Sequence, residues 1–302
     1  MTGALRARVA TWLARDCRPE VIAFARQLAE EAGADAVLFY GSNLRTGSLD
    51  GVLDFYILMP GRQIERIWPR VSYRELDYEG ARLRAKIATM SSNQFARAAE
   101  GERRDTTIWT RFVQPSALVW ARNEAVRQAI IDAIAVAATT ASRFAAALGP
   151  DRGTAEDYWR ALFRATYRAE FRVEKGGRED SILSANRDHF DGLLPDAWQA
   201  DGLAFDQKAE VLKPRFPPGK RREILTRWKA RERFGKPLNL VRLAKATTTF
   251  DGAARYGAWK LHRHTGIELE VTPFREKHPL LAMPGAAWEL WRLRRKRSRN
   301  QR

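Results

Sequence analysis

Apolar residues in the first third of the chain follow two different spacings. Where they recur every three or four residues they predict amphipathic helices, and where they form short runs or alternate with polar residues they predict strands. The helical stretches are residues 5–13 and 19–28, with a helix end at Gly33, and the strand stretches are residues 35–40, 51–59 and 82–90. Residues 41–49, between the first two strands, are predicted to form a turn.

The pattern becomes helical after this sheet-forming part. Helical periodicity extends over residues 123–148 and 154–173. Residues 213–219 (KPRFPPG) contain three prolines and a glycine, which break helices and predict a linker or an exposed loop. We therefore expect an α+β protein with a mixed-sheet domain over residues 1–122, a helical domain over residues 123–212 and a C-terminal extension over residues 213–302.

Charge separates the C-terminal extension from the rest of the chain. The 302 residues carry a net charge of +17, and residues 213–302 hold 24 Lys or Arg against 7 Asp or Glu. Residues 1–212 hold 29 charged groups of each sign. All of the excess positive charge therefore belongs to the last third, which predicts an anionic partner, either nucleic acid or a lipid surface. The alternative is a basic face that serves only solubility.

Composition excludes several classes of protein. Because Cys17 is the single cysteine, an internal disulfide and a Cys-rich zinc site are excluded, and a reducing compartment is expected. The longest plausible membrane-spanning candidate is the Ala-rich stretch, whose uncharged part, residues 133–142, is half of the roughly 20 residues that a membrane-spanning helix needs. Neither a P-loop nor a Gly-rich dinucleotide fingerprint is present, which argues against nicotinamide and P-loop chemistry.

The candidate chemistry begins with Tyr40, Gly41 and Ser42 after the first predicted strand, followed by Asp54 in the second. A glycine allows backbone N–H groups to approach a phosphate closely, and the serine hydroxyl adds a hydrogen bond. A carboxylate on the adjacent strand can hold Mg²⁺ against the same phosphate. Together these residues predict a phosphate and metal site.

This arrangement resembles the nucleotidyltransferase superfamily, in which Gly-Ser and a downstream acidic strand bind a nucleoside triphosphate and its magnesium. The superfamily usually has two carboxylates one residue apart, whereas the second position here is Tyr56. A narrower resemblance, to the phosphatidate cytidylyltransferases of the mitochondrial translocator assembly and maintenance type, accounts for this departure. In that family the second strand likewise consists of an apolar residue, Asp and Phe, here Leu53, Asp54 and Phe55.

The narrower resemblance continues in order over residues 36–192. Lys86 lies in a strand similar to the lysine-bearing strand of the family, and Trp109, Phe112 and Pro115 match its Trp, aromatic and Pro positions. The helical-domain pattern is matched by Tyr167, Glu170, Phe171 and Arg172, and then by Ile182, Asn186 and Phe190. The basic last third matches the family less clearly.

The resemblance implies the reaction of CTP with phosphatidate to give CDP-diacylglycerol and pyrophosphate, with Mg²⁺ as cofactor. It implies that Asp54 holds the metal, that Tyr40, Gly41 and Ser42 bind the nucleotide, and that Lys86 offsets negative charge on the nucleotide or the attacking phosphate. The substrate phosphate is assigned to Tyr167, Arg172 and Asn186. The second metal ligand is left open between Asp50 and Glu170.

The basic C-terminal extension suits an enzyme whose substrate is an anionic lipid. Trp228, Trp259, Trp288 and Trp291 lie among its basic residues, where they could anchor at a bilayer, stack on nucleic-acid bases or, for Trp228 and Trp259 above all, belong to a core. We expect a cytoplasmic protein bound peripherally to the inner face of the membrane. The alternatives are a catalytically inactive nucleotidyltransferase-like protein that binds nucleic acid, and an enzyme that transfers nucleotides to RNA or protein.

Overall fold

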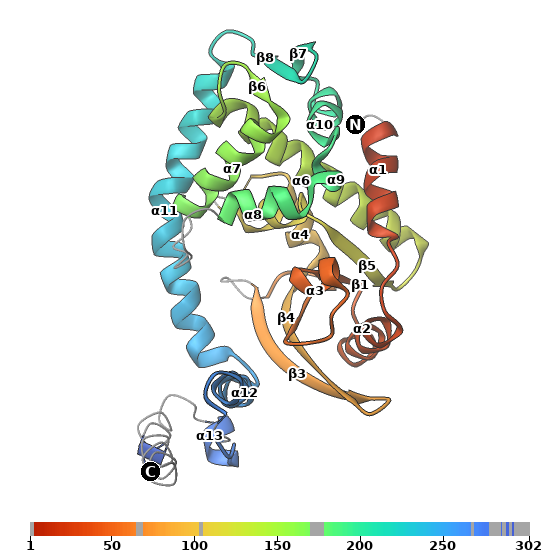
Figure 1. Cartoon of the computed structure of the whole chain (residues 1–302), viewed down its shortest axis with the longest axis vertical. Coiled ribbons are helices and arrows are strands. Elements are labelled where there is room, and N and C mark those ends of the chain that lie inside the picture. Colours follow the sequence, from red (N-terminus) through yellow and green to blue (C-terminus); the bar gives the residue numbers. More distant parts are fainter. Residues whose placement is uncertain are drawn as a thin grey trace, which may run out of the picture.

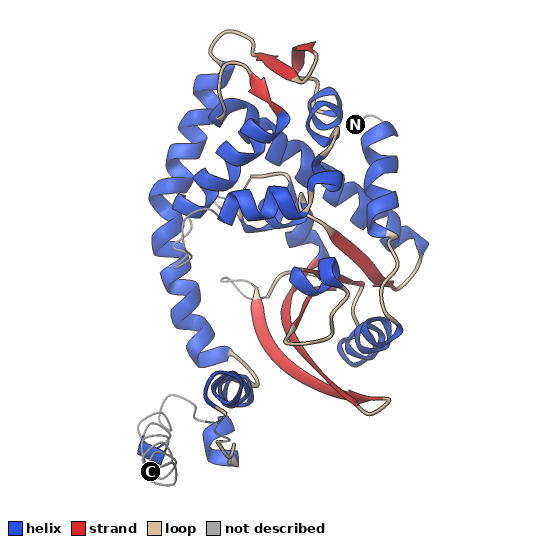
Figure 2. Cartoon of the chain, viewed as in Figure 1, coloured by secondary structure: helices blue, strands red, loops and turns tan. Residues whose placement is uncertain are grey.

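The computed structural model describes residues 3–64, 69–102, 105–169, 178–266 and 269–277, together with residues 285, 288, 289 and 292. It is an α+β protein with a five-stranded mixed sheet, as expected, and a smaller three-stranded sheet (Figures 1 and 2). The strand order in the large sheet is β3-β4-β2-β1-β5.

Three strands of the large sheet are those that the sequence predicts. They are β1 (Ala36–Tyr40), β2 (Leu53–Met59) and β4 (Ala81–Ser91). Strands β3 (Arg70–Tyr78) and β5 (Ser116–Ala121) form the two edges of the sheet and were not predicted. Strands β2 and β4 pair in parallel, and the other neighbours are antiparallel, so the sheet is mixed.

The sheet has two covered faces. Helix α2 (Pro19–Ala32), which ends at Gly33 in the left-handed conformation, packs on the face that carries Val37, Phe39 and Phe55. Residues of opposite parity, such as Leu38 and Tyr56, face the larger core cluster. That cluster includes residues of α1 (Gly3–Leu13), α4 (Ser92–Ala99), α5 (Thr107–Phe112) and α6 (Glu124–Leu148). Alternation of side chains along each strand thus separates the two cores.

Helix α6 is the central helix of the larger core. Its first turn is capped by Asn123, whose side-chain oxygen accepts a hydrogen bond from the N–H of Val126. At 25 residues, it is long and apolar enough to cross a membrane, but 78% of its most apolar window is buried inside the protein. Its apolar character is therefore explained by contacts with the surrounding helices.

The helical section continues through four helices and the small sheet. These elements are α7 (Ala155–Ala169), α8 (Arg178–Ala185), α9 (Arg187–Phe190), α10 (Leu193–Ala200), β6 (Gly153–Thr154), β7 (Ala204–Lys208) and β8 (Val211–Arg215). The prediction of a linker or loop over residues 213–219 is wrong for its first three residues, which belong to β8. Pro214 is accepted there because the paired part of β6 reaches only Val211 and Leu212, which leaves one side of Pro214 without a neighbouring strand.

The basic extension begins as a long helix that packs on the body of the protein. Helix α11 (Lys220–Thr249) runs beside α6 and α7 and ends near β3 (Figure 1). The core role of Trp228 is confirmed: its ring is buried and contacts the rings of Trp109 and Phe144. Because residues of the sheet, α6, α7 and α11 share one core, the domain boundaries at residues 122 and 212 stay a prediction.

The chain then covers one edge of the large sheet. After α11, Asp251 pairs with the edge strand β3, where its carbonyl accepts from the N–H of Tyr73 at 2.8 Å and its carboxylate contacts Arg74 at 2.6 Å. Helices α12 (Ala253–Thr265) and α13 (Pro273–Lys277) follow. Trp259 of α12 is half-buried, with the guanidinium of Arg84 over its ring. An edge that could pair with another chain is therefore partly blocked.

Candidate functional site

The register of the large sheet places three of the predicted site residues in one row. Tyr40 lies opposite Asp54 in the β1–β2 pair, and Asp54 lies opposite Lys86 in the β2–β4 pair. Residues that are directly opposite share a face, so the three side chains lie on the same side of the sheet as Tyr56 and the larger core. The row is found where β1 ends and the chain turns into the short helix α3 (Ser42–Thr46).

A cavity of about 350 Å³ gathers residues from both the sheet and the helical section. We call it the sheet-edge cavity, because it lies where strand β1 ends and the chain turns into α3. Its described lining includes seven of the predicted site residues: Tyr40, Gly41, Ser42, Asp54, Lys86, Tyr167 and Asn186. Tyr167 comes from α7, and Asn186 lies between α8 and α9. Positions more than 140 residues apart in the sequence are thus neighbours in the structure.

Three candidate residues are not placed in this cavity. Arg172 and Glu170 lie outside the described residues. Asp50 is exposed and is not among the cavity-lining residues; its carbonyl accepts a hydrogen bond from the Asn43 side chain at 2.8 Å. Asn43 is buried and also binds the Ser48 carbonyl, so the turn after α3 is fixed with Asp50 on its outer side.

Two cationic residues of the cavity were missed by the sequence analysis. Arg45 in α3 and Arg111 in α5 both line it, and the Arg111 guanidinium lies 4.7 Å from the centre of the Tyr40 ring. The available signal was their position, because Arg45 follows Ser42 by three residues and Arg111 lies between Trp109 and Phe112. Trp109 and Phe112 themselves are fully buried and hold α5 in the core.

Gly41 is required by two separate features of the turn. Its φ of 92° and ψ of −164° fall in a region that is essentially restricted to glycine. A Cβ at this position would lie 2.9 Å from Oδ2 of Asp54. The backbone of Gly41 therefore lies directly against the candidate carboxylate, which is the close approach that a glycine permits.

The carboxyl group of Asp54 is partly buried in the wall of the cavity. Burial raises its pKa, while the positive charges of Lys86 and, to a smaller extent, Arg111 act in the opposite direction without cancelling the effect. An acid with a raised pKa in a cavity, beside two cations, is a common feature of functional sites.

Tyr56, two residues after Asp54, is not among the cavity-lining residues. Tyr56 lies on the same face as Asp54 but is 1% exposed, and its ring contacts those of Tyr40, Phe95 and Phe112. Burial raises the pKa of its hydroxyl far above the usual value. A carboxylate at this point would be enclosed by aromatic rings and not by the cavity, at a high desolvation cost.

The oxygen donors of the cavity suit a magnesium ion that is shared with a phosphate. Asp54 supplies a carboxylate and Ser42 a hydroxyl, and Mg²⁺ is commonly bound through one or two carboxylates together with substrate phosphates and water. Among the described residues no group of three or more His, Cys, Asp or Glu side chains could hold a metal by itself. Any Mg²⁺ here would therefore depend on a bound phosphate and water for the rest of its ligands.

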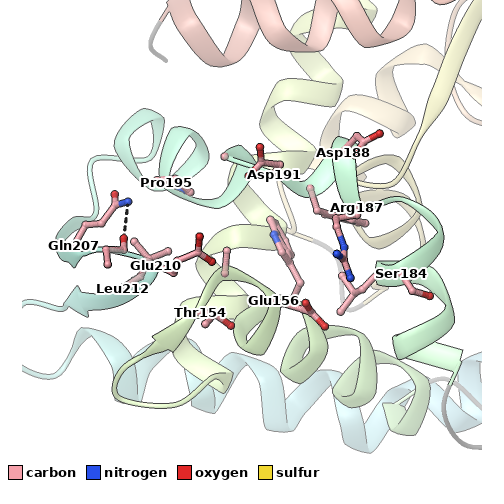
Figure 3. A pocket seen from close by; sticks show the side chains of 16 residues that line it. Thr154, Glu156, Ser184, Arg187, Asp188, Asp191, Pro195, Gln207, Glu210 and Leu212 are labelled. Atoms are coloured by element: carbon pink, nitrogen blue, oxygen red, sulfur yellow. Dashed lines mark hydrogen bonds between the residues drawn. The ribbon is translucent and has the colours of Figure 1, made fainter.

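A second cavity has a different chemistry. It has a volume of about 590 Å³ and lies between α7, the α8–α10 segment and the small sheet (Figure 3). Its acidic residues Glu156, Asp188, Asp191 and Glu210 outnumber the single basic residue, Arg187. This excess of negative charge disfavours a phosphate ligand, so the sheet-edge cavity is the better candidate.

Comparison with known proteins adds no assignment. No protein-family model matches the chain, and no curated protein matches it.

Replacing Gly41 by Ala should disrupt the site more than the matched change Gly47→Ala. Gly47 also has a positive φ, of 67°, but a Cβ there would meet nothing within 4 Å. Gly47→Ala should therefore cost only the left-handed backbone strain of about 1–2 kcal/mol, whereas Gly41→Ala adds a clash with Asp54. Urea unfolding of both variants measures the difference, and equal losses would show that the contact with Asp54 is unimportant.

Replacing Asp54 by Asn should stabilise the protein at neutral pH. Because the folded-state pKa of Asp54 is raised, its stability contribution is present at low pH and is lost as the pH rises through that pKa. The amide imitates the protonated acid, so the advantage of Asp54→Asn over the parent should disappear on acidification. Denaturant unfolding between pH 3 and pH 7 tests this, with the exposed Asp16→Asn as control; a constant difference across the range would contradict it.

Proposed function

We propose that this protein transfers a cytidylyl group from CTP to phosphatidate and forms CDP-diacylglycerol and pyrophosphate at a membrane surface. The observation that supports the proposal is the sheet-edge cavity, in which seven residues chosen from the sequence line one space. Their choice rested on a resemblance in separate segments of the chain. A wrong alignment of these segments would not be expected to bring them together.

The proposed reaction needs charge neutralisation and alignment more than covalent chemistry. A phosphate oxygen of phosphatidate attacks the α-phosphorus of CTP, the bond from that phosphorus to the bridging oxygen breaks, and pyrophosphate leaves with the electron pair. Gly41 and Ser42 bind the triphosphate, since both line the cavity at the turn after β1. Lys86 and Arg111 offset the negative charge that develops on the oxygens around phosphorus.

The other residues of the cavity position the two substrates. Asp54, with Ser42, would hold the Mg²⁺ that supplies further charge neutralisation when it is bound. Tyr167 and Asn186 approach from the helical section, opposite the strand residues, and are assigned to the acceptor phosphate. The position of Arg172 lies outside the described residues, so its assignment to the same phosphate rests on the sequence resemblance alone.

An inactive nucleic-acid-binding protein is the second candidate, because Asp54 is the one carboxylate among the described cavity-lining residues. The contacts of α11 argue against it. Arg231 donates to the Gly101 carbonyl and lies over the Phe144 ring, and Arg242 pairs with the buried Asp105 at 2.9 Å. Arg231 and Arg242 therefore stabilise the fold and are not available to a nucleic-acid backbone.

Membrane association is assigned to the end of the basic extension. Residues 288–302 contain seven basic groups and one acidic group, and Trp288 is 59% exposed. Each basic group near an anionic bilayer contributes about 1 kcal/mol of attraction at physiological salt. A cytoplasmic protein held peripherally at the inner face of the membrane would meet phosphatidate where it occurs.

The transferase proposal predicts that purified protein converts labelled CTP and phosphatidate to labelled CDP-diacylglycerol in the presence of Mg²⁺. Asp54→Asn should lower the rate by at least about 100-fold, as expected for loss of a group that stabilises transition-state charge. Asp77→Asn, exposed on the β3–β4 hairpin, is the isosteric control and should keep full activity. Parallel reactions with ATP and with an RNA acceptor separate the alternatives. Activity retained by Asp54→Asn would refute the assignment of the site.

The docking assignment predicts that removal of residues 286–302 weakens sedimentation with phosphatidate-containing vesicles. Binding to uncharged phosphatidylcholine vesicles should be weak with and without this segment, and added salt should reduce the binding of the full chain. Equal binding of the full and shortened chains to anionic vesicles would show that the attachment lies elsewhere.

A further inference from the structure

A third cavity of about 710 Å³ adjoins the sheet-edge cavity, and we call it the arginine cavity. It lies between α1, α3 and the α8–α9 segment. The two cavities share Arg45, Pro115 and Asn186 in their linings. Its volume is within the usual range for small-molecule sites. Because the two linings overlap, a ligand held there would lie next to the row formed by Tyr40, Asp54 and Lys86.

Positive charge dominates the described lining of the arginine cavity. Arg8, Arg15, Arg45 and Arg187 line it, against one carboxylate, that of Asp188. Arg8 is occupied, since it pairs with Asp196 at 2.6 Å and donates to the Asp191 carbonyl. Among the described residues, the structure shows no ion pair to a carboxylate for Arg15, Arg45 or Arg187.

Arg15 is a half-buried cation. Its Nε donates to the Trp12 carbonyl at 2.9 Å, and burial lowers the pKa of its guanidinium. A half-buried guanidinium is better stabilised by an anion in the adjacent cavity than by the carbonyl alone. Arginine also offers a planar pair of N–H groups that matches two oxygens of one phosphate.

Trp12 gives a second, independent indication of a ligand. Its side chain lines the arginine cavity and is 7% exposed, and its indole N–H has no hydrogen-bond acceptor among the described residues. The ring is held by contact with His189, 4.5 Å away between centroids. His189 is half-buried, its Nε2 lies 2.8 Å from the Val113 carbonyl, and the structure shows no hydrogen bond from the Trp12 indole to it. A buried donor without a partner is costly unless a ligand oxygen accepts from it.

We propose that the arginine cavity binds the phosphate monoester of the acceptor substrate, with Arg15, Arg45 and Arg187 around its oxygens and the Trp12 indole N–H donating to one of them. The identification of this monoester as the acceptor rests on the proposed transferase function. The anion site itself rests only on the cavity and its residues. The arginine cavity is thus the site where the acceptor phosphate first binds, and the shared wall at Arg45 and Asn186 leads from it to Tyr167 and the nucleotide in the sheet-edge cavity, where the transfer takes place.

The test is calorimetric titration of the full-length protein in the presence of Mg²⁺, carried out first without and then with a saturating concentration of a non-hydrolysable CTP analogue. Inorganic phosphate, glycerol 3-phosphate and a short-chain phosphatidate are titrated in turn, which separates recognition of a free phosphate, of the headgroup and of the lipid. Each monoester that binds should do so with one equivalent. Arg15→Gln should weaken binding about 10- to 100-fold, the range expected for loss of a hydrogen bond to a charged group.

Three variants make the result specific. Arg15→Lys keeps the charge but not the planar pair of donors, so it should restore part of the affinity. Trp12→Phe keeps the ring against His189 and removes the N–H, and it should also weaken binding. Arg26→Gln removes an exposed cation from α2, outside the cavity, and should bind like the parent. Thermal unfolding of each variant verifies that the fold is retained.

Two results would overturn the inference. The first is unchanged monoester binding by Arg15→Gln and Trp12→Phe. The second is loss of monoester binding when the CTP analogue is present, which would assign the arginine cavity to the triphosphate. Failure of the transferase proposal is distinguishable, since Arg15-dependent binding without any transfer leaves the anion site intact. Transfer with an unchanged KM for phosphatidate in Arg15→Gln would retain the enzyme and refute the site.

Discussion

The close contact between Gly41 and Asp54 determines the arrangement of the candidate site. The β1–β2 register places Tyr40 opposite Asp54, and the next residue must turn away without a side chain because the carboxylate occupies the space. The same register fixes Lys86 beside Asp54 through β4. Helix α5 places Arg111 in the same cavity. The buried Trp109 and Phe112 hold this helix in the core. The contact at Gly41 thus fixes one wall of the cavity and the position of its carboxylate.

The net charge of the protein has several structural origins. Part of the excess positive charge of the C-terminal extension is used inside the molecule, where Arg221 binds the end of α6, Arg231 binds the Gly101 carbonyl and Arg242 binds Asp105. By contrast, Arg15 and Arg45 belong to the part of the sequence with no net charge and yet line cavities. Regional net charge therefore indicated where basic residues are numerous, but not which of them face a ligand.

The predictability of each element followed from how strongly its environment restricts its sequence. Strands β1 and β2 are buried on both faces, which gives continuous apolar runs, whereas the edge strand β3 (RVSYRELDY) mixes polar and apolar residues and has no clear signature. Asp54, Lys86 and Asn186 were singled out because a resemblance to one family connected distant segments of the chain. Arg45, Arg111 and Trp12 were missed because their roles depend on helix packing that brings α1, α3 and α5 to one place.

Under the proposed function, the charges of the two adjoining cavities assign one anionic substrate to each cavity. The described lining of the sheet-edge cavity has three cations, Arg45, Lys86 and Arg111, and one carboxylate, Asp54. A triphosphate with its bound metal would neutralise this excess, and the acceptor dianion would then find little uncompensated positive charge there. It needs cations of its own, and the arginine cavity supplies Arg15 and Arg187 beside the shared Arg45. Two adjacent cavities with separate cations hold two anionic substrates together more readily than one larger cavity, because each phosphate is neutralised where it binds.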